Sequence, residues 1–326
     1  MVELDKNYIT QLHRVNRVIY WLDLLGCGLF GWGFFFIAVY TNNIFLEVVA
    51  FLLGTLLIYR GQLFIHEVVH QRKNIKGFAL AYDLLFGYPN TYPSYIHDPH
   101  LAHHGKRTYA TVDDPEYYPH ANDTWMKMLQ PIFSSLLLPL FATLRFCLLP
   151  PIILFFPMRW KKKVYQHAST LVMRLTYIRP IRSDREIHVM MINDLLCSLY
   201  RLIFIILIVM GVFPLKIIWI WLGMFILASV LNMYRTKLAH RYLGDGNPMS
   251  SVAQLLDSVS VSGSFLSGIW APVGLRYHSG HHLYPVIPYH NLGKLHRYLT
   301  RQENRQHPYN KTVFPSFFKA FFHFIK

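Results

Sequence analysis

Charged residues are scarce in this 326-residue chain: Asp, Glu, Lys and Arg make up 15% of it, whereas hydrophobic residues make up 53%. In an average soluble domain about a quarter of the residues are charged, so this composition favours an integral membrane protein. The chain also lacks linkers rich in Pro, Gly or Ser, internal repeats and low-complexity tracts, which favours one domain over residues 1–326. Its amino-terminal stretch has no A-x-A cleavage signal, so we expect the first apolar segment to be retained.

Cysteine is almost missing. Cys27, Cys147 and Cys197 lie in apolar surroundings, and none of them belongs to a C-x-x-C pair. This pattern excludes a disulfide framework and an internal iron–sulfur cluster, and it is typical of small buried residues.

Acidic residues are outnumbered by basic ones, 17 against 32, and the formal net charge is +15. All but two of the basic residues lie before residue 18, in 60–193 or after residue 233, so they flank the apolar segments. Such a distribution is typical of the cytoplasmic parts of membrane proteins. We therefore expect cytoplasmic termini, a cytoplasmic middle segment, no nucleic-acid partner and residence in a bacterial inner membrane.

Long apolar segments predict an all-α membrane protein with four transmembrane helices in two hairpins, because one crossing takes about 20 apolar residues. The expected spans are residues 19–40, 44–65, 195–213 and 217–235. Interfacial helices and a cytoplasmic helical cap, made of residues 66–193 and 236–326, should complete the fold. The segment 129–157 is also apolar, but its five prolines and Arg145 predict helices that lie in or dip into the interface.

Histidines are concentrated in three short groups: HEVVH at 66–70, HLAHH at 100–104 and HSGHH at 278–282. Spacings of three and four residues place side chains on one face of a helix, so each group can point its imidazoles at one locus. Eight imidazoles exceed the three or four ligands of one zinc ion, which predicts two metal ions. Nitrogen ligands with open positions favour iron that handles oxygen, with zinc as the alternative. The predicted ligands are His66, His70, His100, His103, His104, His278, His281 and His282.

These groups resemble those of the integral-membrane fatty acid desaturases and their hydroxylase and carotenoid-ketolase relatives. The resemblance extends over residues 20–300 and includes DDPEYYP after the second group, AHRY at 239–242 and GLRYHSGHHLYPVIPYHNLGKLH at 274–296. It implies a non-haem di-iron centre on the cytoplasmic side, with O2, two electrons and a long acyl chain as reactants. It also implies His240 as a ninth ligand. Where one animal desaturase group has asparagine, this chain has Thr236, so no water-mediated ligand is inferred.

Carboxylates are expected to orient the ligating imidazoles and to fix their tautomers. The candidates are Glu67, Asp98, Asp113, Asp114, Glu116 and Asp257, together with His97, which either supports the second group or is structural.

The resemblance implies an O2-dependent fatty acyl desaturase, with lipid or carotenoid hydroxylation or ketolation as the alternative, because the same ligands serve both outcomes. The chain has no haem-binding H-P-G-G segment, so its electrons should come from a separate ferredoxin or small cytochrome with its reductase, which the basic face could attract.

Two other classes fit parts of the sequence. HEVVH matches the zinc-protease motif H-E-x-x-H, with Glu67 as general base, but a protease gives the other two groups no role. A metal transporter would place its ligands near the bilayer midplane rather than at the ends of the spans.

Overall fold

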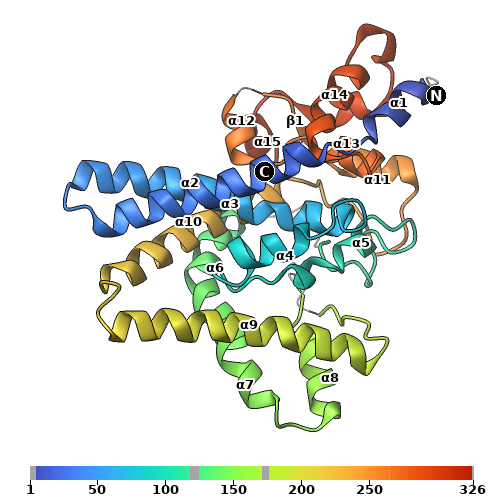
Figure 1. Cartoon of the computed structure of the whole chain (residues 1–326). Helices are drawn as coiled ribbons and strands as arrows, with labels where there is room; N and C mark the ends of the chain where they lie inside the picture. The colour runs from blue at the N-terminus through green and yellow to red at the C-terminus, as the bar shows by residue number, and fades with distance from the viewer. Residues whose placement is uncertain (1–4, 118–124, 171–175, 264, 325–326) are drawn as a thin grey trace.

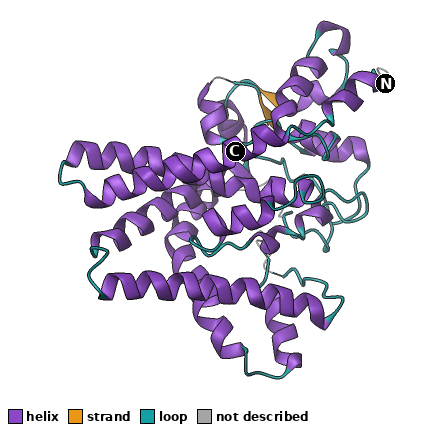
Figure 2. Cartoon of the chain, in the orientation of Figure 1, coloured by secondary structure: helices purple, strands orange, loops and turns teal. Residues whose placement is uncertain are grey.

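The computed structural model describes residues 5–117, 125–170, 176–263 and 265–324. In these residues the regular structure is helical except for one short parallel pair of strands, β1 (Ser260–Val261) and β2 (Val313–Phe314). Figure 2 shows how little strand the described chain contains. The all-helical prediction is confirmed.

Two long hairpins form the apolar part of the fold. Their helices are α2 (Arg17–Tyr40), α3 (Ile44–Gln71), α9 (Asp184–Val209) and α10 (Lys216–Lys237). The side chains of Asn16 and Asn43 cap the N-termini of α2 and α3 by accepting hydrogen bonds from backbone N–H groups. At Gly31 of α2, a Cβ atom would lie 3.1 Å from the Ile58 side chain of α3, so the missing side chain lets the two helices pack closely.

A fifth helical segment, residues 129–153, is also long and apolar enough to cross a membrane, so the described chain holds five such helices where four were expected. Its elements are α6 (Trp125–Thr143), a π-helical turn (Leu144–Leu148) and α7 (Leu149–Ile153). Pro131 and Pro139 lie inside α6 and do not end it. Arg145 does not expose its charge either, because it forms a 2.8 Å ion pair with Asp194 of α9.

The direction of α6 and α7 differs from that of the two hairpins. In Figure 1 they run across the direction shared by α2, α3 and α9. The interfacial placement of residues 129–157 stays a prediction.

The ends of the hairpins separate the molecule into an apolar end and a histidine-bearing end. The turns at 41–43 and 210–215 lie together at the left of Figure 1, and the histidine-bearing helices lie toward the other end. Helix α3 has 28 residues and is about 42 Å long, whereas the hydrocarbon core is about 30 Å thick. The HEVVH group is therefore carried on a continuous extension of the second apolar helix.

Shorter helices complete the fold, and many of them lie toward the histidine-bearing end in Figure 1. They are α1 (Lys6–Leu12), α4 (Phe78–Tyr82), α5 (His100–His103), α8 (Met158–His167), α11 (Ser251–Asp257), α12 (Phe265–Trp270), α13 (His278–Leu283), α14 (Tyr289–Leu299) and α15 (Phe317–Phe324). Single turns of π or 3-10 helix occupy Asp83–Gly87, Ser94–His97, Gln302–Asn304 and Pro308–Thr312. The side of the membrane on which this end lies stays a prediction.

Candidate metal centre

Four segments distant in the sequence bring their imidazoles together. They are the end of α3, the one-turn helix α5, the loop that follows α10, and α13. All nine histidines singled out in the sequence lie in two adjacent clusters, and most of these rings are buried.

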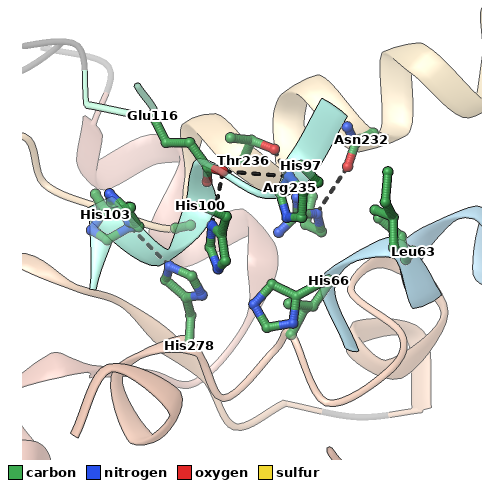
Figure 3. Close-up of a pocket in the computed structure, with 14 residues that line it drawn as sticks. Leu63, His66, His97, His100, His103, Glu116, Asn232, Arg235, Thr236 and His278 are labelled. Atoms are coloured by element: carbon green, nitrogen blue, oxygen red, sulfur yellow. Dashed lines mark hydrogen bonds and ion pairs between the residues drawn. The ribbon is translucent and has the colours of Figure 1, made fainter. Parts of the chain in front are cut away.

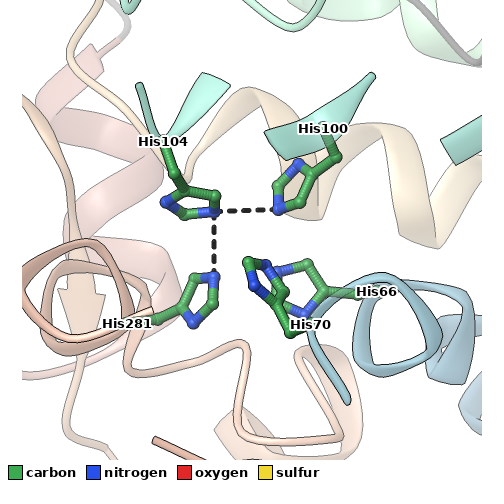
Figure 4. A group of neighbouring side chains, drawn as sticks. All are labelled: His66, His70, His100, His104 and His281. Carbon is green, nitrogen blue, oxygen red and sulfur yellow. Dashed lines mark hydrogen bonds between the residues drawn. The ribbon is translucent and has the colours of Figure 1, made fainter. Parts of the chain in front are cut away.

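The first cluster contains five rings: His66, His70, His100, His104 and His281. One nitrogen of each ring lies within 4.8 Å of a nitrogen of every other ring. The Nε2 atom of His104 lies 2.9 Å from that of His100 and 3.0 Å from that of His281. Figure 4 shows the rings turned toward a common centre.

The second cluster contains four rings: His103, His240, His278 and His282. The Nε2 atom of His240 lies 3.0 Å from that of His103 and 2.8 Å from that of His278. The Nε2 atoms of His278 and His282 are 3.1 Å apart. His240 therefore lies among the other rings, as the AHRY motif implied.

Each H-x-x-H-H group is divided between the clusters, which corrects the expectation that it points at one locus. His100 and His104 belong to the first cluster and His103 to the second, whereas His281 belongs to the first and His278 to the second. A helix turns by about 100° per residue, so consecutive rings cannot face the same point. One group of three therefore serves two centres.

The spacing of the nitrogens fits metal ions better than hydrogen bonds. A neutral imidazole Nε2 makes one in-plane hydrogen bond, yet the Nε2 atom of His240 has two close nitrogen neighbours. Two nitrogens bound at right angles to one metal, each at about 2.1 Å, lie about 3.0 Å apart. The observed separations of 2.8–3.1 Å match that value, and the donor set is one that iron accepts.

The protonation of the rings also suits metal binding. Burial, followed by the neighbouring imidazoles, holds the pKa of His104, His281 and His282 well below its usual value. These rings are therefore neutral at pH 7, which is the form that binds metals. His103 differs: burial opposes its charge, but the Asp114 carboxylate outweighs burial and raises the pKa of His103.

Carboxylates hold the outer nitrogens of several rings. Both carboxylate oxygens of Asp114 lie 3.0 Å from His103 Nδ1, and Glu116 Oε1 lies 2.8 Å from His100 Nδ1. Burial raises the pKa of Glu116 to about 7. These contacts leave the Nε2 atoms of His103 and His100 facing the clusters, which is how carboxylates orient metal-binding histidines.

Asp257 acts on His240 through a residue that sequence reasoning missed. Tyr109 donates a 2.6 Å hydrogen bond to Asp257 Oδ2, and its hydroxyl lies 2.8 Å from His240 Nδ1. Tyr109 lies between the second histidine group and DDPEYYP, but a single tyrosine carries no spacing signal. Glu67, by contrast, lies 3.4 Å from His66 Nδ1 and accepts a hydrogen bond from Tyr20.

Two of the expected carboxylates do not reach the clusters, and their assignment is corrected here. Asp98 forms a 2.7 Å ion pair with Arg72, and the exposed Asp113 donates a 3.2 Å hydrogen bond from its backbone N–H to Thr111 Oγ1. His97 is buried and stacks on His100, with ring centroids 4.5 Å apart, so it packs behind a cluster ring.

Comparison with known proteins identifies the class to which this site belongs. The chain matches the family model for fatty acid desaturases over residues 42–313, and it belongs to this family. It is also similar to a ceramide hydroxylase of Caulobacter vibrioides (strain NA1000 / CB15N), with 36% identity over 308 residues, 94% of this chain and 87% of the relative. No solved structure matches the chain. The chain is thus an oxidoreductase of lipid metabolism with membrane-spanning helices.

Proposed function

We propose that this protein is a di-iron, O2-dependent hydroxylase of a ceramide-like membrane lipid. The observation that carries the proposal is the pair of imidazole clusters, found in a chain that is similar over 94% of its length to a ceramide hydroxylase. The nine clustered histidines are the proposed ligands, five for one iron and four for the other.

The reaction requires chemistry that side chains lack. Iron bound at the clusters would supply the oxidant for an unactivated C–H bond, which no side-chain acid or base can break. The protein supplies placement. Asp114 and Glu116 hold His103 and His100 with Nε2 toward the clusters, and burial keeps bulk water away from the reacting carbon.

Fatty acyl desaturation is the second candidate, and the match to the desaturase family favours it. The same imidazoles serve both reactions, because the outcome depends on how the lipid carbons are positioned relative to the irons. We favour hydroxylation because the similarity to the Caulobacter ceramide hydroxylase extends beyond the histidine groups to nearly the whole chain.

The electrons are proposed to come from a separate ferredoxin or small cytochrome with its reductase. Exposed basic residues follow two of the histidine groups: Lys73 and Lys76 after HEVVH, and Lys106 and Arg107 after HLAHH. A basic surface this close to the clusters favours an acidic carrier. We further propose that this end of the molecule faces the cytoplasm of a bacterium, in agreement with the distribution of Lys and Arg.

The decisive experiment is expression in a bacterium that makes ceramide, followed by mass spectrometry of its lipids. A lipid heavier by one oxygen identifies a hydroxylase, and a lipid lighter by two hydrogens identifies a desaturase. His281→Ala serves as the inactive control, because it removes one ring of the first cluster. A purified protein that holds one zinc per chain and no iron would overturn the proposal in favour of a metalloprotease.

A further inference from the structure

A pocket borders both imidazole clusters. His66 and His100 of the first cluster line it, as do His103, His240 and His278 of the second. A lipid carbon in this pocket would therefore lie next to both proposed irons. Figure 3 shows the rings on one side of the pocket and residues of α10 on another.

The surface of the pocket is mostly apolar, with a few polar side chains among its lining residues. Its apolar residues are Leu63, Ile65, Ala239 and Leu275, and its polar residues outside the clusters are His97, Glu116, Asn232, Arg235 and Thr236. Burying polar groups against a hydrocarbon chain costs free energy unless they are hydrogen-bonded. An enzyme that oxidises the middle of an acyl chain would thus be expected to surround the reacting carbon with apolar side chains. A charged and two neutral polar side chains of α10 beside a mostly apolar surface suit the junction between the polar and apolar parts of a lipid.

Arg235, in the last turn of α10, supplies the positive charge of the pocket. Its Nε donates a 3.1 Å hydrogen bond to Asn232, and one Nη donates a 2.8 Å bond to Thr236. Both acceptors are uncharged side chains of α10 that lie within three residues of Arg235. Arg235 also interacts with the Tyr59 side chain and attracts the carboxylate of Glu116, which lines the same pocket. Among the residues that the structure describes, however, no carboxylate oxygen lies within 4.0 Å of its guanidinium, which has five N–H donors.

The bonds to Asn232 and Thr236 hold the guanidinium in place and leave donors for a ligand. A side chain fixed in this way loses little conformational freedom when it binds an oxygen. Because the same pocket contains cluster rings, an oxygen bound by Arg235 would bring the adjacent carbons of the lipid toward the irons.

We propose that Arg235 binds an oxygen of the polar group of the lipid, and that the carbon oxidised lies within a few bonds of that group. The proposal rests on the proposed function, since it takes the pocket as the lipid site of a di-iron enzyme. Arg235 is assigned as a specificity-determining residue. The polar group is an uncharged amide or hydroxyl, as in a ceramide, or another oxygen-bearing group close to the start of the chain.

The first test measures binding without turnover. Iron-loaded protein in detergent, with no electron donor, is titrated with a dihydroceramide and with an alkane of the same chain length. Because a hydrogen bond to a charged group contributes about 1.5–3 kcal/mol, Arg235→Gln should weaken dihydroceramide binding roughly tenfold to a hundredfold. Alkane binding should not change. Arg235→Lys, which keeps the charge, should recover part of the affinity.

The matched control is Arg297→Gln, which removes one charge from an exposed arginine of α14 outside the pocket. It should bind both compounds like the wild type. Iron content and size-exclusion behaviour show whether each variant is folded. Equal affinity of the wild type and Arg235→Gln for dihydroceramide would overturn the assignment.

The second test locates the modification in the product by fragmentation mass spectrometry. A modified carbon next to the amide or hydroxyl supports the proposal, and Arg235→Gln should spread the modification over several carbons. A hydroxyl in the middle of the chain would refute the inference and leave the proposed hydroxylase intact. A double bond near the polar group would support the assignment of Arg235 and overturn the proposed hydroxylase in favour of a desaturase. If no lipid is converted, the binding comparison decides.

Discussion

Asp114 offers the sharpest test of the metal assignment. Its side chain is fully buried and accepts from three donors: His103 Nδ1 and the backbone N–H groups of Ala110 and Glu116, the last two at 2.9 Å. In Asp114→Asn, one acceptor oxygen must serve these donors and an NH2 group is placed among them. At least one buried donor then loses its partner, which costs about 1–3 kcal/mol.

The cost should appear in the affinity for metal. Changing a group that orients a metal-binding histidine lowers metal affinity by roughly 10- to 100-fold, which is about 1.4–2.8 kcal/mol and agrees with the hydrogen-bond value. We expect Asp114→Asn to weaken the second cluster, which contains His103, more than the first. During dialysis against increasing chelator, its iron content should pass through a plateau near one ion per chain.

The neighbouring Asp113 provides the control. It is exposed and contacts no cluster ring, so Asp113→Asn changes the same charge in the same loop without touching an imidazole. Its iron content should follow that of the wild type at every chelator concentration. The reasoning fails if Asp114→Asn keeps both ions as tightly as the wild type, or if Asp113→Asn loses iron equally.

Three further predictions concern other parts of the molecule. His281→Ala should abolish product formation and lower bound iron while the protein stays folded, as measured by lipid analysis, metal content and circular dichroism; full activity would contradict the ligand assignment. Tyr109→Phe removes the hydroxyl between Asp257 and His240, so it should lower iron affinity by a smaller factor than Asp114→Asn in the same dialysis. Burial lowers the pKa of His296 to about 4, so the unfolded chain binds more protons between pH 4 and 6.5 and stability should fall as pH falls through this range. Metal-free His296→Asn should show a flatter dependence of its melting temperature on pH, and parallel curves would refute this.

Much of the architecture could be predicted because long apolar runs and histidine spacing are strong signals. The sequence was least informative at residues 129–153, where Pro131 and Pro139 lie inside a helical segment long and apolar enough to cross a membrane. The helix continues there because a π-helical turn relaxes the backbone geometry and Asp194 neutralises Arg145, and neither compensation can be seen in the local sequence.

In the site, too, the features set by local spacing could be predicted, and those set by tertiary contacts could not. The three histidine groups were visible as patterns, whereas their partners were not. Asp113 and Asp114 are adjacent in the sequence, yet only Asp114 faces a ring, and Tyr109 joins Asp257 across 148 residues of chain. Such contacts depend on how loops fold back, which spacing alone does not determine.

The division of the two H-x-x-H-H groups between the clusters has a mechanical consequence. Helix α5 with its C-terminal capping residue His104 gives two rings to the first cluster and one to the second, and α13 does the reverse. Each short helix thus connects the two clusters, so the spacing of the clusters depends on the geometry of the helix backbone as well as on side-chain packing. The two groups have the same spacing of histidines, and both helices depend on it. Inserting a single residue within either group would rotate the later rings by about 100° relative to the earlier ones, so they would no longer face their clusters.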